Sequence, residues 1–88
     1  MKIKENFKVR KIAGENLIVS QGSTHADLTK IISLNQTALY LWENLEGKDF
    51  TKEVAAKLLS EKYGVDEATA LADASRWIDK MVKEGVIE

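Results

Sequence analysis

The sequence predicts an α+β domain in which a three-stranded antiparallel sheet is followed by a three-helix bundle. Two observations support this prediction. In residues 1–34 apolar side chains alternate or form short branched runs, whereas after residue 35 they recur at the i, i+3, i+4, i+7 spacing of helical faces. No Pro/Gly/Ser-rich linker or internal repeat divides the chain. The 88 residues are therefore expected to form one domain, residues 1–88, with a single core.

The first strand is predicted at residues 7–12, where apolar and charged side chains largely alternate. Residues 13–16 supply a turn, because glycine tolerates positive φ and asparagine often does. Residues 17–19 are then expected to form a second strand that pairs with the first as an antiparallel hairpin. A polar loop at residues 21–26 leads to a third strand at about residues 28–34.

The first helix is predicted to begin after Asn35, a preferred N-cap residue, and to end before Gly47. Between them one apolar stripe recurs at helical spacing, formed by Ala38, Leu41, Trp42 and Leu45. A tryptophan within such a stripe is more often part of the core than a ligand contact. Trp42 is therefore assigned to the core.

The second helix is expected at residues 51–63, with Thr51 as N-cap and Gly64 at its end. Its buried side and margin are predicted to comprise Val54, Ala55, Leu58, Leu59 and Lys62. Asp66 caps the third and longest helix, which continues to about Glu84. Its apolar face is predicted to comprise Leu71, Ala74, Trp77, Ile78, Met81 and Val82. After Gly85, residues 86–87 are expected to fold back onto the core.

The composition argues against catalysis and metal binding. There is no cysteine, the glycines are too dispersed for a phosphate loop, and the single histidine, His25, lies in a polar loop without an orienting partner. We therefore predict a non-enzymatic domain without a cofactor. The N-terminus contains neither a signal peptide nor a membrane span, so a cytoplasmic location is expected.

Nucleic-acid binding is an alternative, because a small sheet with three helices is compatible with a winged-helix DNA reader. The formal net charge is −1, and the cations of the last helix are interleaved with carboxylates that would repel phosphates. The first eleven residues are locally basic, which is more typical of a protected edge strand. A further alternative is a structural assembly module, and an exposed strand edge can also pair with a second copy to form a homodimer.

Several short motifs together resemble the family of coenzyme PQQ synthesis protein D, and they cover roughly residues 7–87. They are Leu34-Asn35-Gln36-Thr37-Ala38, Leu41-Trp42-Glu43, Leu45-Glu46-Gly47, the set Thr51, Val54, Ala55 and Leu58, and then Tyr63-Gly64-Val65, Ala72-Asp73, Trp77-Ile78 and Gly85-Val86-Ile87. The sequence departs from the family at Trp77, where phenylalanine is more frequent, and at residues 74–75, which are smaller than usual.

The resemblance implies a RiPP recognition element, a winged-helix-like module that captures the leader segment of a ribosomally made precursor peptide. Such modules present the peptide to a modifying enzyme, commonly a radical SAM maturase. In the family the leader adds as a strand to the third strand and rests against the third helix. The peptide-binding residues expected here are Lys30, Ile31, Ile32, Ser33 and Leu34 on the strand, and Asp73, Trp77 and Lys80 on the last helix. On the strand, Ile32 and Leu34 are expected to face the core. The opposite flank of the helix, with Ser75 and Asp79, is the alternative wall.

Overall fold

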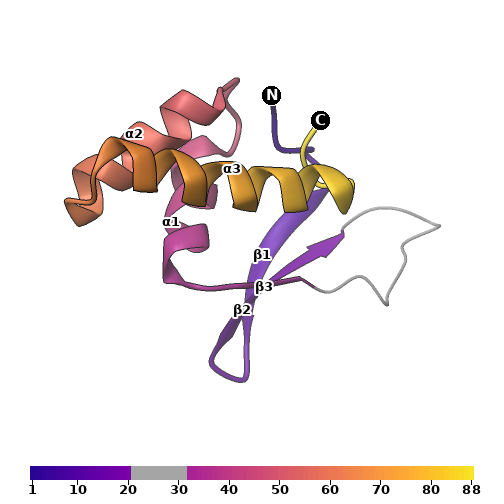
Figure 1. The fold of residues 1–88 in the computed structure, drawn as a ribbon. Helices are drawn as coiled ribbons and strands as arrows, with labels where there is room; N and C mark the ends of the chain where they lie inside the picture. The colour runs from indigo at the N-terminus through magenta and orange to yellow at the C-terminus, as the bar shows by residue number, and fades with distance from the viewer. Residues whose placement is uncertain (21–31) are drawn as a thin grey trace.

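The architecture of the chain is taken from a computed structural model, and the structure is described for residues 1–20 and 32–88. The elements are β1 (Phe7–Ile12), β2 (Glu15–Ser20), β3 (Ile32–Leu34), α1 (Gln36–Leu45), α2 (Lys52–Tyr63) and α3 (Glu67–Lys83). The strands form one antiparallel sheet in the order β1-β2-β3. The helices gather at one end of it, while the β1–β2 hairpin extends away from them like a wing (Figure 1). The predicted fold class is confirmed.

The hairpin loop is shorter than the sequence predicted. Ile12 pairs with Glu15, and Asn16 pairs with Leu34 of β3, so the expectation that residues 15–16 belong to the turn is wrong. Only Ala13 and Gly14 remain in the loop, with φ angles of 53° and 82°. Two consecutive positive φ angles give the turn a twist that matches that of the flanking strands, so pairing continues to the end of the hairpin.

The third strand is confirmed over Ile32–Leu34. Ile32 and Leu34 are buried and Ser33 is exposed, as the alternation predicted. Residues 28–31 of the expected strand lie outside the part of the chain that the structure describes.

The three predicted N-caps are all confirmed. The side chains of Asn35, Thr51 and Asp66 each accept a hydrogen bond from the backbone N–H three residues later, at 2.8, 3.2 and 2.9 Å. Gly64 ends α2 in the left-handed conformation, as expected. These caps fix where each helix begins.

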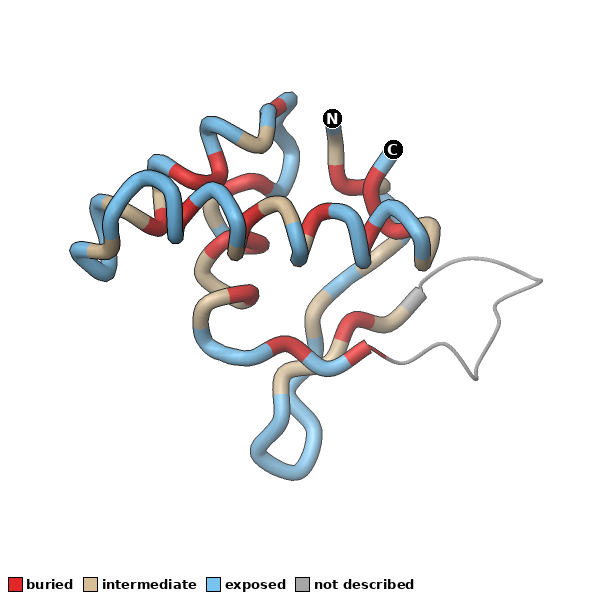
Figure 2. The backbone as a smooth tube through the Cα atoms, viewed as in Figure 1, coloured by how far each residue is buried: buried red, intermediate tan, exposed pale blue. Residues whose placement is uncertain are grey.

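The core lies where the sheet meets the helices (Figure 2). Its buried residues are Ile3, Ile18, Ile32, Leu34, Ala38, Leu41, Trp42, Leu45, Phe50, Ala55, Ala56, Leu59, Ala70, Ala74, Ile78, Met81, Val86 and Ile87. The prediction that Val54, Leu71 and Val82 face the core is wrong, because these side chains are 47, 42 and 47 % exposed. The buried faces of α2 and α3 are narrower than predicted, and small alanines form much of each. The larger side chains at the margins of these faces point toward solvent.

Both chain ends pack beside the helices. Ile3 forms an antiparallel bridge with Ile87, and the N–H of Lys4 donates to the carbonyl of Val86 at 2.9 Å. The expected return of residues 86–87 to the core is confirmed, since both are almost fully buried. Figure 1 shows the two ends side by side above the sheet. None of the helices described is long and apolar enough to cross a membrane.

Candidate functional site

A groove of about 380 Å³ lies between the β3–α1 segment and α3. This volume falls within the ~300–1,000 Å³ typical of ligand sites. One wall consists of Ser33, Asn35, Thr37, Ala38 and Leu41, α2 contributes Leu59, and the other wall consists of Asp73, Arg76, Trp77, Lys80 and Met81. The buried residues Ala38, Leu41, Leu59 and Met81 therefore give the groove an apolar part, while both walls also carry polar side chains, and those that are charged lie on α3.

The β3 wall offers an open strand edge. Among the described strands β3 is hydrogen-bonded to β2 alone, so the backbone groups on its other side have no strand partner there. Ile32 and Leu34 anchor β3 in the core, and Ser33 faces the groove. Lys30 and Ile31, the other two predicted strand residues, lie outside the described residues.

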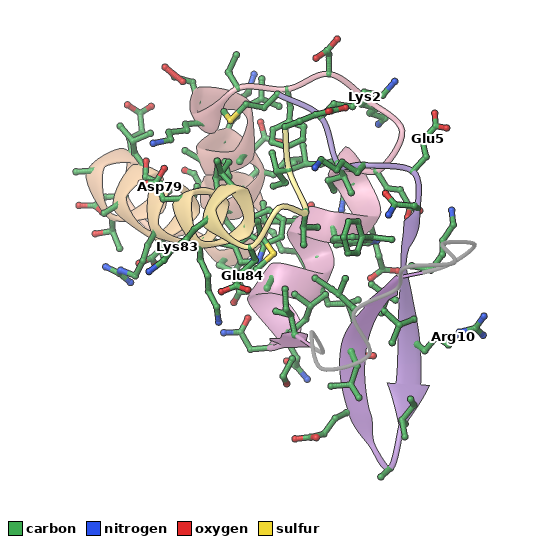
Figure 3. All side chains as sticks on the ribbon, turned by 90° about the vertical axis from the view of Figure 1, so that its right-hand side faces the viewer. Lys2, Glu5, Arg10, Asp79, Lys83 and Glu84 are labelled. Atoms are coloured by element: carbon green, nitrogen blue, oxygen red, sulfur yellow. The ribbon has the colours of Figure 1, made fainter. Side chains whose placement is uncertain are left out.

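The α3 wall brings together all three predicted helix residues. Asp73, Trp77 and Lys80 line the groove. The alternative flank does not line it: neither Ser75 nor Asp79 contributes. Oδ1 of Asp79 instead forms an ion pair with Nζ of Lys52 on α2, at a distance of 2.8 Å. In Figure 3, Asp79 and Lys83 project from α3, whereas Arg10 projects from β1 on the side away from the helices.

Arg76 is a groove residue that the sequence reasoning missed. Its Nη1 donates to Oδ1 of Asp73 at 3.3 Å, one helical turn away. The signal was available, because position 76 is three residues after Asp73 and four before Lys80 and therefore shares their face. The wall thus presents two cations and one carboxylate, and that carboxylate already contacts one of the cations.

The two tryptophans differ in what their indole N–H groups meet. Trp42 is 2 % exposed, as its core assignment predicted, and its Nε1 donates to Oε2 of Glu46 at 3.1 Å. Trp77 is half-buried in the groove wall, and its Nε1 is shielded from solvent. Within the described part of the chain, Trp77 Nε1 has no acceptor.

The remaining chemistry of the described residues is sparse. They contain no cluster of three or more His, Cys, Asp or Glu side chains able to hold a metal ion. His25 lies outside them. Hydrogen bonds from the side chain and backbone of Thr69 lower the pKa of Asp66, the α3 N-cap.

The sequence comparison identifies the family of this fold. The family of coenzyme PQQ synthesis protein D (PqqD) matches residues 17–87. The chain belongs to the PqqD family. The matched region of this PqqD-family domain runs from β2 to the end of the core and includes both walls of the groove. A comparison with curated proteins gave no significant match.

A solved structure shares the fold of this PqqD-family domain over its whole length. It is that of TbiB1 in complex with the TbiA(beta) leader peptide. The two superpose with a TM-score of 0.75 at 20 % sequence identity, over 100 % of this chain and 95 % of the other. The likeness independently supports the arrangement of the sheet and the three helices.

Proposed function

We propose that this PqqD-family domain is a non-catalytic adaptor that captures the leader segment of a ribosomally synthesised precursor peptide by strand addition to β3. The observation that carries the proposal is the open β3 edge beside a groove whose second wall is α3. The structural relative TbiB1 was solved with a leader peptide, which supports a peptide as the ligand.

The mechanism follows from the two walls. An extended peptide in the groove can exchange backbone hydrogen bonds with the free edge of β3, which fixes its register. Its side chains alternate in direction, so every second one points toward the apolar part of the groove near Ala38, Leu41 and Leu59. Backbone pairing supplies general affinity, while the groove and the α3 side chains select among peptides.

The adaptor then presents the bound peptide to a modifying enzyme, which we propose to be of the radical SAM maturase type. Because precursor peptides emerge from the ribosome, the complex forms in the cytoplasm. An unoccupied β3 edge can also pair with a second copy of the domain, so peptide capture and homodimer formation compete for the same backbone groups.

The test is an amide NMR titration with synthetic leader segments of short open reading frames beside the gene. Shifts are expected on β3 and on the groove face of α3. A binding peptide is then N-methylated at one residue at a time. Strand addition predicts that methylation abolishes binding at every second residue and leaves the intervening residues tolerant, because alternate N–H groups face β3. Uniform tolerance, or shifts confined to β1, would refute strand addition at β3.

A further inference from the structure

The groove wall holds a hydrogen-bond donor, Trp77 Nε1, that no described residue uses. Trp77 Nε1 is shielded from solvent and has no acceptor among the described residues. A buried donor without a partner is unfavourable compared with one that is paired or solvated. The site already described explains why a large aromatic ring lies here, since the ring covers part of the core. It does not explain the N–H group.

The neighbours of Trp77 define the kind of acceptor that fits. Arg76 and Lys80 flank it on the same wall, and both side chains are cationic. Asp73 is the single carboxylate of this wall, and Arg76 contacts it at 3.3 Å. Among residues 1–20 and 32–88, Lys80 has no carboxylate within 4 Å, so none of these residues pairs with its charge. A donor beside a cation favours an anionic acceptor.

We propose that the groove selects a peptide segment carrying an aspartate or glutamate, whose carboxylate accepts the Trp77 Nε1–H bond and pairs with Lys80. This inference rests on the proposed peptide capture and adds the chemistry of the captured segment. Among the described residues none accepts a hydrogen bond from the Trp77 indole, so turning the ring on binding, to bring its shielded N–H to the carboxylate, would break no hydrogen bond to them. The indole of Trp42, bonded to Glu46, is held in place.

The peptide side of this proposal is tested with a positional-scanning library of acetylated, amidated decapeptides. Asp and Glu are expected to be enriched over Asn and Gln at one position. In the best decapeptide, replacing that acidic residue with its amide is expected to weaken binding about tenfold, in line with the loss of a charge-assisted hydrogen bond. Peptides that bind without an acidic preference would overturn this inference and leave strand capture standing. Failure of every decapeptide and leader segment to bind would overturn strand capture itself.

The protein side is tested with Trp77→Phe and Lys80→Gln. Trp77→Phe keeps an aromatic ring but removes the N–H, and we expect about tenfold weaker binding of the acidic decapeptide and little change for its amide counterpart. The unfolding midpoint of this variant should not fall much, because no described residue accepts a hydrogen bond from the N–H that is lost. Lys83→Gln is the matched control: Lys83 also lies on α3 but does not line the groove, so binding should stay within about twofold. Equal losses for both peptides would mean that Trp77 acts by packing alone and would overturn the proposal.

The indole N–H signals provide a readout that packing alone would not give. The chain has two tryptophans, so two indole resonances are expected. On adding the acidic decapeptide, the Trp77 signal should shift downfield as it gains a charged acceptor, while the Trp42 signal stays in place because its acceptor is internal. A stationary Trp77 signal at saturating peptide would overturn the assignment.

Discussion

The two edges of the sheet differ in how they are held and in what lies beside them. β1 has six residues and none is buried, whereas β3 has three residues in the structure and two of them are buried. β1 carries outward cations such as Lys8 and Arg10, and Figure 3 shows Arg10 pointing away from the helices. β3 borders a groove closed by α3.

This difference teaches that an open edge is not by itself a binding site. Both edges offer backbone groups, but they have different neighbours: β3 lies beside the groove whose second wall is α3, whereas the hollow beside β1 is lined by α1 and by the carboxylates of Glu43 and Glu46. The cations on β1 would repel each other if two copies paired through that edge in an antiparallel manner. The same three-stranded sheet therefore has one edge whose own charges oppose pairing and one edge that we propose to bind the peptide.

The largest expected effect contrasts one side chain from each edge strand. Leu34 of β3 is 5 % exposed, so Leu34→Ala should lower the free energy of unfolding by about 2–4 kcal/mol through lost burial and a residual cavity. Val9 of β1 is only partly buried against the core, so Val9→Ala should cost about 1 kcal/mol. Urea unfolding followed by tryptophan fluorescence measures both. Equal losses would show that the two edges are anchored alike.

Local chemistry explains which parts of the fold were predictable from the sequence. Asn35, Thr51 and Asp66 cap their helices through hydrogen bonds to residues three positions later, so the signal is contained in a few neighbouring residues. The alternation at Ile32 and Leu34 is equally local. By contrast, the pairing of Ile3 with Ile87 joins opposite ends of the chain, and no local pattern encodes it.

The sequence-based predictions were wrong where tertiary packing decides which of several neighbouring positions on a helix is buried. Leu71 and Val82 fit a broad apolar face on α3, but the fold buries the alanines at positions 70 and 74 and leaves both larger side chains exposed. At the groove, the face containing Asp73, Trp77 and Lys80 could be predicted from helical periodicity. By contrast, the sequence could not predict that Trp77 Nε1 lacks an acceptor among the described residues, because this depends on which atoms the fold places around the indole.

A smaller effect is expected at the tip of the β1–β2 hairpin, far from the groove. Ala13 has a φ of 53°, a conformation that asparagine adopts more readily than alanine, and Asn-Gly is the preferred pair for such a two-residue loop. Ala13→Asn should therefore raise the free energy of unfolding by about 0.5–1 kcal/mol. Peptide affinity should not change, since Ala13 does not line the groove. Thermal unfolding and a peptide titration test the two halves of this prediction separately.

A substitution at the neighbouring Gly14 should change the free energy of unfolding in the opposite direction. Gly14 has a φ of 82°, and although an added Cβ would meet no atom within 4 Å, a side chain there is strained by the backbone conformation itself. Gly14→Ala should therefore destabilise the hairpin. If Ala13→Asn weakened peptide binding, the hairpin tip and the groove would be coupled, and the contrast between the two edges would be less complete.

The smallest effect concerns the beginning of α3, the helix that forms the second wall. Hydrogen bonds from Thr69 lower the pKa of Asp66 below its usual 3.8, so the charged cap stabilises the folded state above the unfolded pKa. That contribution is lost as the pH falls through the lower, folded-state pKa. Asp66→Asn keeps a capping side chain that does not titrate. Relative to the parent chain, the variant should therefore gain stability as the pH falls from 6 to about 3, as measured by urea unfolding at each pH. Identical pH profiles would mean that the Asp66 cap does not contribute to acid sensitivity, and that the start of this wall, like the β3 wall, is held by core contacts, here those of residues such as Ala70.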